Sequence, residues 1–170
     1  MLPVDNSILA STQTCDTQAA LRYGLGLAVP EDSAPPVAGT AIHEAFAAWF
    51  KQAGDVAAAM AALDLHYRAW AEEHVPDPDD RLSWLNVSRV MQQWFDTHTL
   101  DRFPVRIAPA MVEVGFALPL DGNFVFVGRM DGLGQEERGA FAVVDHKSSY
   151  RLDDKWRRTH RTSAQMTGYT

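Results

Sequence analysis

FVFVGRMDGLGQEERGAFAVVDHK, residues 124–147, holds the clearest structural signals of this 170-residue chain. Both of its ends are runs of apolar residues rich in Val and Phe, which is typical of strands. Its middle is rich in Gly and charged residues, which is typical of a turn. The pattern predicts one strand over about 123–131, a turn or loop over 132–139 and a second strand over about 140–148.

Three charged residues stand where these two strands end. Asp131 closes the first strand, and Asp145 and Lys147 close the second. Residues two apart on a strand point to the same face, so Asp145 and Lys147 project together, beside Asp131 if the strands pair as a hairpin. Two carboxylates and an ammonium are costly to bury unless they pair or bind a metal, and such oxygen ligands suit Mg²⁺ or Mn²⁺. A surface salt bridge at a strand end is the simpler interpretation of Asp-x-Lys alone.

The sequence before this hairpin predicts one more strand and a helical half. Apolar residues alternate with others over about 108–120, and Asp-Gly-Asn at 121–123 is a hairpin turn signal. We predict an α/β fold with one mixed sheet flanked by helices, in a single domain over 1–170. Its helical part is about 1–102, and the sheet with its following helix is about 103–170. Helical spacing of apolar residues predicts helices over about 7–27, 39–53, 55–73 and 79–100.

Composition excludes several classes of protein. Apolar residues make up 46% of the chain and charged residues 22%, which rules out a disordered or collagen-like chain. The single Cys cannot form an internal disulfide, so a secreted disulfide scaffold is excluded and a reducing, cytoplasmic location is expected. The chain has no apolar run near about 18 residues and no basic or apolar leader, so no membrane partner and no secretory signal are expected.

The formal net charge of −7 argues against a non-specific nucleic-acid binder until the charge is divided along the chain. Residues 147–161 hold six basic and two acidic side chains, a net charge of +4, which leaves −11 for the rest. This window is expected to be a loop, with a helix beginning near Thr159. A solvated helix face is the simple interpretation of such a run, and an anion-binding strip on an acidic protein is the sharper one.

Five short elements follow one another along the chain. They are Gly39-Thr40-Ala41-Ile42-His43-Glu44, Glu113 between two valines, Asp131 in Gly-Arg-Met-Asp-Gly, Asp145-His146-Lys147, and Gln165-x-x-x-Tyr169. Each is weak alone, but their order and spacing resemble the PD-(D/E)xK nuclease superfamily. From about residue 7 to residue 169 the chain resembles the RecB-type branch, which includes helicase-linked exonuclease domains and CRISPR-associated nucleases.

The resemblance implies a restriction-endonuclease-like fold and a nuclease that hydrolyses DNA phosphodiester bonds with Mg²⁺ or Mn²⁺. It implies an exonuclease of DNA repair, recombination or phage DNA processing, with helicase or recombination proteins as partners. It assigns catalysis to Asp131, Asp145 and Lys147. It assigns metal binding to Asp131, Asp145, His43 and the backbone carbonyl of His146. Glu113 either faces this site or lies in a polar layer, and without the resemblance His43 would be a core or boundary residue.

Residues after the second acidic strand are the candidates for nucleic-acid binding. For Gln165 and Tyr169, one helical turn apart, the resemblance implies contact with nucleic acid or support of the catalytic Lys, and ordinary packing is the alternative. Arg157, Arg158 and Arg161 suit phosphate, because a guanidinium offers two parallel donors.

Cys15 lies where some RecB-type nucleases place the first of four cysteines that hold an iron–sulfur cluster. Four thiolates are the norm and this chain has one, so a buried free Cys is preferred and a cluster is expected only in a longer form. The chain stops at Thr170, where the family continues, which suggests a C-terminally truncated domain. A catalytically incomplete, nuclease-like module for DNA binding or assembly is therefore the alternative function.

Overall fold

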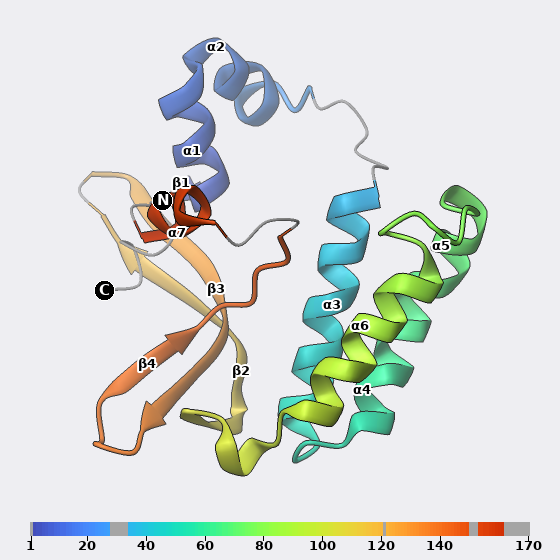
Figure 1. Ribbon diagram of the computed structural model, residues 1–170. Helices are drawn as coiled ribbons and strands as arrows, with labels where there is room; N and C mark the ends of the chain where they lie inside the picture. Colours follow the sequence, from blue (N-terminus) through green and yellow to red (C-terminus); the bar gives the residue numbers. More distant parts are fainter. Residues whose placement is uncertain (1, 28–33, 121, 150–152, 162–170) are drawn as a thin grey trace. The chain divides into compact units, whose positions relative to one another are not determined.

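The computed structural model describes residues 2–27, 34–120, 122–149 and 153–161 (Figure 1). The chain divides into two compact units. The large unit comprises Glu31–Val114 and Met130–Lys147, and the small unit comprises Met1–Pro30, Gly115–Arg129 and Ser148–Thr170. The architecture is mixed α/β, with a four-stranded mixed sheet and flanking helices, which confirms the predicted fold class.

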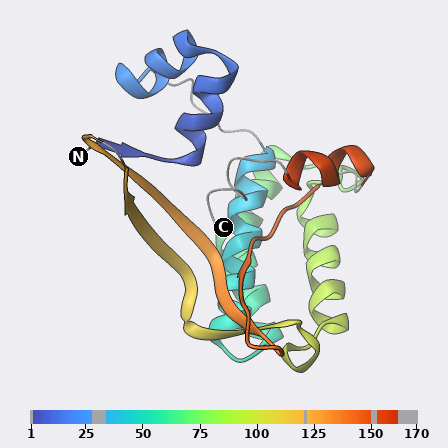
Figure 2. The same cartoon turned by 90° about the vertical axis from the view of Figure 1, so that its left-hand side faces the viewer.

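The sheet consists of β1 (Leu2–Val4), β2 (Val105–Pro119), β3 (Phe124–Glu136) and β4 (Phe141–Val144). β3 lies between β1 and β2, and Figure 2 shows β2 (gold) and β3 (orange) as two long strands. β1 runs parallel to β3, whereas β4 runs antiparallel to β3 with Gly132 opposite Val144. The predicted hairpin of β3 and β4 is therefore confirmed.

Strand boundaries differ from the prediction where single contacts or short length decide them. β4 ends at Val144 instead of near residue 148, because the backbone then leaves the sheet and the N–H of His146 donates to the Asp131 side chain. β3 continues past Asp131 to Glu136, so the loop is shorter than predicted. β1 escaped prediction because three residues are too few to show a periodicity.

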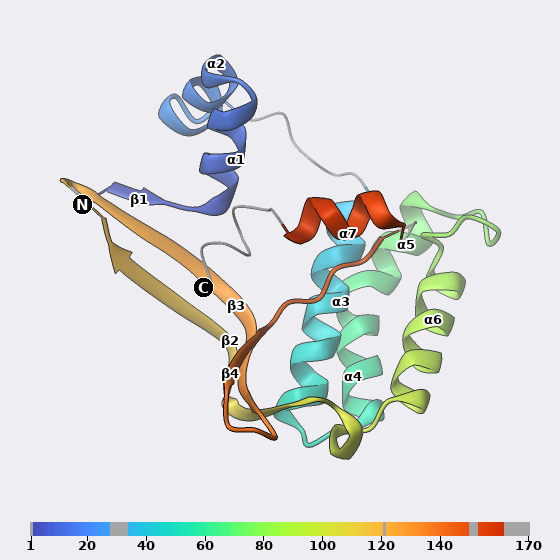
Figure 3. The ribbon, with the colours of Figure 1, turned by 60° about the vertical axis from the view of Figure 1, so that its left-hand side comes forward.

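The helical elements of the large unit are α3 (Ala34–Lys51), α4 (Val56–Leu63), η2 (Asp64–Arg68), α5 (Ala69–His74), α6 (Trp84–Thr97) and η3 (Leu100–Arg102). α3 packs on α4, and α4 packs on α6 (Figure 3). The largest side chains that are almost fully buried between these helices are Trp49, Leu63, Tyr67 and Phe95. Burial of each side chain of this kind contributes about 1.5–3 kcal/mol, so this core fixes the position of α3.

Helix boundaries in the large unit depend on features that apolar spacing does not report. α3 begins at Ala34 rather than 39, because its first turn accommodates prolines, whose missing N–H has no partner there. The helix predicted over 55–73 is interrupted by η2, a π-helical segment. α6 begins at Trp84 rather than 79, because Ser83 caps it by accepting a hydrogen bond from the N–H of Asn86.

The small unit holds α1 (Asn6–Thr14), α2 (Asp16–Ala19), η1 (Ala20–Gly24) and α7 (Asp154–Arg161). The continuous helix predicted over 7–27 is wrong, because the extended backbone of Cys15 separates α1 from α2. Cys15 is exposed, so its prediction as a buried Cys is also wrong. α7 begins before Thr159, because Asp153 accepts a 2.8 Å hydrogen bond from the N–H of Trp156. Among the helices that the structure describes, none is both long and apolar enough to cross a membrane.

Candidate metal and catalytic site

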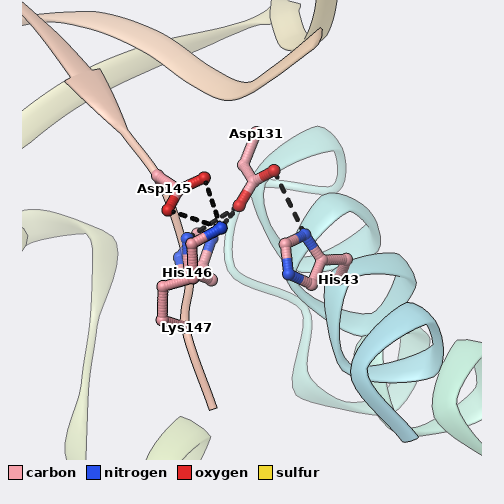
Figure 4. A network of polar contacts seen from close by, with 5 residues as sticks. All are labelled: His43, Asp131, Asp145, His146 and Lys147. Atoms are coloured by element: carbon pink, nitrogen blue, oxygen red, sulfur yellow. Dashed lines mark hydrogen bonds and ion pairs between the residues drawn. The ribbon is translucent and has the colours of Figure 1, made fainter. Parts of the chain in front are cut away.

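Four parts of the large unit bring titratable side chains together. α3 carries His43, β2 carries Glu113 and β3 carries Asp131. Segment 145–147, which follows β4, carries Asp145, His146 and Lys147. Figure 4 shows the side chains from α3, β3 and this segment facing one another. The candidate site is therefore assembled from elements far apart in the sequence, and all of it lies within one compact unit.

Asp131 lies at the centre of the site. Its Oδ1 lies 3.1 Å from Nδ1 of His43, and its Oδ2 accepts a 2.7 Å hydrogen bond from the backbone N–H of His146. Burial alone would raise the pKa of Asp131, but contacts from the His146 ring, from His43 and from the His146 N–H outweigh it and hold that pKa well below its usual range. The hydrogen bond to Asp131 raises the pKa of His43 above its usual value, against the effect of burial. Without a bound cation the site therefore favours a charged His43–Asp131 pair.

His146 contributes its ring as well as its backbone. The ring stacks on Phe46 of α3, with centroids 3.9 Å apart and planes 11° apart, and its Nδ1 lies 3.5 Å from Oδ2 of Asp131. The sequence prediction gave His146 only a carbonyl and missed these contacts. One signal for them exists: Phe46 follows His43 by one helical turn, so both side chains lie on one face of α3.

Asp145 and Lys147 project together. Nζ of Lys147 lies 2.9 Å from Oδ2 and 3.1 Å from Oδ1 of Asp145. The Asp145 side chain is only 3% exposed and that of Lys147 is 30% exposed. Because the carboxylate is buried, this pair is not a surface salt bridge. The ammonium is partly exposed, so it can contact a ligand that arrives from solvent.

A group of three potential metal donors lies in this site. His43, Glu113 and Asp131 each offer one atom, and the three atoms lie within 4.8 Å of one another. Glu113, left open by the sequence, thus faces the site, and its φ of +59° places it in the left-handed region. Asp145 is not a member of this group within the described residues. One imidazole nitrogen and two carboxylate oxygens fit a divalent cation that keeps water ligands.

The predicted nucleic-acid contacts lie in the small unit or outside the described residues. Arg157 and Arg158 are exposed on α7, and Nη1 of Arg157 lies 3.8 Å from Oδ1 of Asp154. Arg161 is the last residue of α7. Gln165 and Tyr169 lie outside the described residues. The single Cys of the chain, Cys15, cannot by itself supply a four-thiolate cluster.

The sequence matches the PD-(D/E)XK nuclease superfamily over residues 6–170. Comparisons with curated proteins and with solved structures gave no match. Proteins of this superfamily are nucleases that use divalent metal ions. The matched range includes every side chain of the site described above. The chain belongs to the PD-(D/E)XK nuclease superfamily.

Proposed function

We propose that this protein is a metal-dependent deoxyribonuclease of the RecB-type branch that hydrolyses phosphodiester bonds with Mg²⁺ or Mn²⁺. The observation that carries the proposal is the position of Asp131. This one carboxylate contacts His43 on α3 and the backbone of the segment that holds Asp145 and Lys147. Superfamily membership and the three-donor group support the same chemistry.

The chain's own residues would hold the cation and set its surroundings. His43, Glu113 and Asp131 supply one donor atom each, and Asp145 and the carbonyl of His146 are the further donors on the adjacent segment. A bound divalent ion would polarise the scissile phosphate and lower the pKa of a coordinated water. Because Asp131 raises the pKa of His43, the imidazole must release its proton before its nitrogen can act as a ligand.

Lys147 is the residue proposed to act on the reacting atoms. Asp145 contacts its ammonium with both carboxylate oxygens and so limits the directions in which Nζ can donate. A fixed ammonium of this kind stabilises negative charge on a phosphate oxygen and positions the attacking water. Its partial exposure lets it reach a substrate from solvent.

The DNA substrate, and an exonuclease role in DNA repair, recombination or phage DNA processing, complete the proposal. Arg157, Arg158 and Arg161 would contact phosphates, and Gln165 and Tyr169 would contact the strand or support Lys147. Helicase or recombination partners belong to the same branch assignment, and a cytoplasmic location is proposed from the single Cys.

The test is a nuclease assay with Mn²⁺ or Mg²⁺ on linear single-stranded, linear duplex and closed circular DNA. We expect the wild type to degrade linear DNA and spare closed circles, and Lys147→Ala to lose at least about 100-fold in rate. Lys51→Ala, which removes an exposed Lys at the end of α3, is the matched control and should keep wild-type activity.

Two results would change the assignment. Equal rates for the wild type and Lys147→Ala would contradict the catalytic role of Lys147. DNA binding by the wild type without cleavage in either metal would favour the alternative of a catalytically incomplete binding module.

A further inference from the structure

We propose that His146 is a positioning residue that clamps segment 145–147 to α3 and aligns the carboxylate of Asp131. The clamp itself stands on the packing and hydrogen bonds of the protein without metal. Its consequence for metal binding rests on the proposed nuclease function. The proposal concerns the side chain between the Asp and the Lys, which the sequence motif leaves unspecified.

The ring of His146 lies on a rigid aromatic surface. It stacks on Phe46 at 3.9 Å, and Phe50 lies 5.8 Å away at a tilt of 42°. Phe46 is itself buried, with edge contacts to Trp94 at 4.7 Å and Phe95 at 5.4 Å. Because core side chains of this kind are closely packed, the position of Phe46 determines that of His146 and of the segment to which it belongs.

Packing alone does not account for a histidine at this position. Its Nε2 is buried and has no hydrogen-bond partner within the part of the chain that the structure describes, which costs free energy that a Phe ring would not cost. Its Nδ1 is also buried and makes no hydrogen bond of normal geometry within the described residues, but it lies 3.5 Å from Oδ2 of Asp131, within ion-pair distance. The backbone N–H of the same residue donates to that oxygen at 2.7 Å. The ring and the backbone N–H of His146 therefore lie close to the same carboxylate oxygen.

The two oxygens of Asp131 are thus held from different elements. Oδ1 faces His43 on α3, and Oδ2 faces His146. Since His146 stacks on Phe46, one turn after His43, α3 fixes this carboxylate both directly and through the stacked ring. Residues that orient a metal-binding carboxylate in this way commonly change metal affinity when they are replaced.

Three variants separate the parts of this clamp. His146→Phe keeps the stacked ring and removes Nδ1. His146→Asn keeps a short side-chain N–H donor and removes the stacked ring. His98→Phe is the matched control. His98, like His146, stacks on an aromatic ring, in its case that of Trp94 at 4.1 Å, but His98 is exposed and is not part of the candidate site.

Two measurements report on the two parts. Hydrogen exchange of backbone amides, measured by NMR without metal, reports on the clamp. We expect the amide of residue 146 to exchange about tenfold faster in His146→Asn, which loses the stacking, and near the wild-type rate in His146→Phe. Titration calorimetry with Mn²⁺ reports on alignment, and His146→Phe should bind about tenfold more weakly than the wild type. His98→Phe should match the wild type in both.

Each part of the proposal has a result that overturns it. Wild-type exchange at residue 146 in His146→Asn would overturn the clamp, and wild-type Mn²⁺ affinity in His146→Phe would overturn the alignment. A wild-type protein that binds no Mn²⁺ would instead contradict the proposed function. In that case the hydrogen-exchange comparison, which uses no metal, still decides the clamp.

Discussion

Glu113 departs from strand geometry where β2 passes the site. Its φ of +59° lies in the left-handed region, which costs a non-glycine residue about 1–2 kcal/mol. Consecutive side chains on a regular strand point to opposite faces. Here Val112 is buried in the core, and the next residue still brings a carboxylate oxygen within 4.8 Å of donor atoms on His43 and Asp131. The strain favours a functional role for this carboxylate over a stabilising one.

Replacing Glu113 with Gly removes the carboxylate and the backbone strain together. We expect the free energy of unfolding of the metal-free protein to stay constant or rise by up to about 1 kcal/mol, because glycine accepts a positive φ. The Mn²⁺ affinity should fall by at least about tenfold. Urea denaturation and titration calorimetry measure the two quantities.

Glu136→Gly, at the exposed end of β3, is the control for this substitution. It should lower the free energy of unfolding by about 0.5–1 kcal/mol and leave the Mn²⁺ affinity unchanged. If Glu113→Gly lost more stability than this control, the carboxylate would be a structural element rather than a strained ligand.

The stability of the metal-free protein should depend on pH through His43 and Asp131. The raised pKa of His43 gives a stabilisation that is complete below its usual value of 6.5 and is lost as the pH rises through the raised value. The lowered pKa of Asp131 has the opposite sign, so its stabilisation is present above the usual 3.8 and is lost as the pH falls. The pair therefore contributes most between these two limits.

Asp131→Asn removes both contributions. With EDTA present, the difference in free energy of unfolding between the wild type and Asp131→Asn should be larger at about pH 5.5 than at about pH 8.5. Urea denaturation at the two pH values measures it. A difference that did not change with pH would show that His43 carries no extra proton in the folded protein.

At the scale of elements, β3 approaches β2 closely at Gly134. A Cβ added there would lie 2.5 Å from the backbone oxygen of Arg106 and 2.6 Å from Cγ1 of Val105. Gly134→Ala should therefore lower the free energy of unfolding by about 1–3 kcal/mol, because the backbone must move to make room for the methyl group. At Gly39 in α3, an added Cβ would have no neighbouring atom of the described residues within 4 Å, so Gly39→Ala should raise the free energy of unfolding by about 1 kcal/mol. Thermal unfolding of both variants tests this, and a Gly134→Ala protein as stable as the wild type would contradict the close approach.

Local periodicity predicted the type of most elements but not their ends. The alternation of apolar residues located β2, because burial on one face leaves a two-residue period. Runs of apolar residues on either side of a Gly-rich turn located the hairpin of β3 and β4. The ends depend instead on single hydrogen bonds. Ser83 starts α6, Asp153 starts α7, and the N–H of His146 ends β4 by leaving the sheet for Asp131. No periodicity reports such bonds.

At the scale of the whole molecule, the candidate site was predictable in composition more than in geometry. The sequence predicted the candidates His43, Asp131, Asp145 and Lys147, because the proposed chemistry restricts which residue type can stand at each of these positions. The sequence did not predict that the Glu113 side chain faces the site, since this depends on how β2 lies relative to α3. The same holds for the His146 ring, whose partner Phe46 is distant in sequence but adjacent in the fold.

The charge distribution of the whole chain predicts how DNA binding should depend on salt. The net charge is −7, whereas residues 147–161 carry +4, so this window is the strongest candidate for contacts with phosphates. If Lys147, Arg157, Arg158 and Arg161 make the phosphate contacts, the slope of log K against log salt should be about −3 to −4. Arg158→Gln should make the slope shallower by about one, whereas Arg89→Gln, at an exposed position on α6, should leave it unchanged. Fluorescence anisotropy in Ca²⁺ measures the slopes, and equal slopes for both variants and the wild type would exclude a phosphate contact by Arg158.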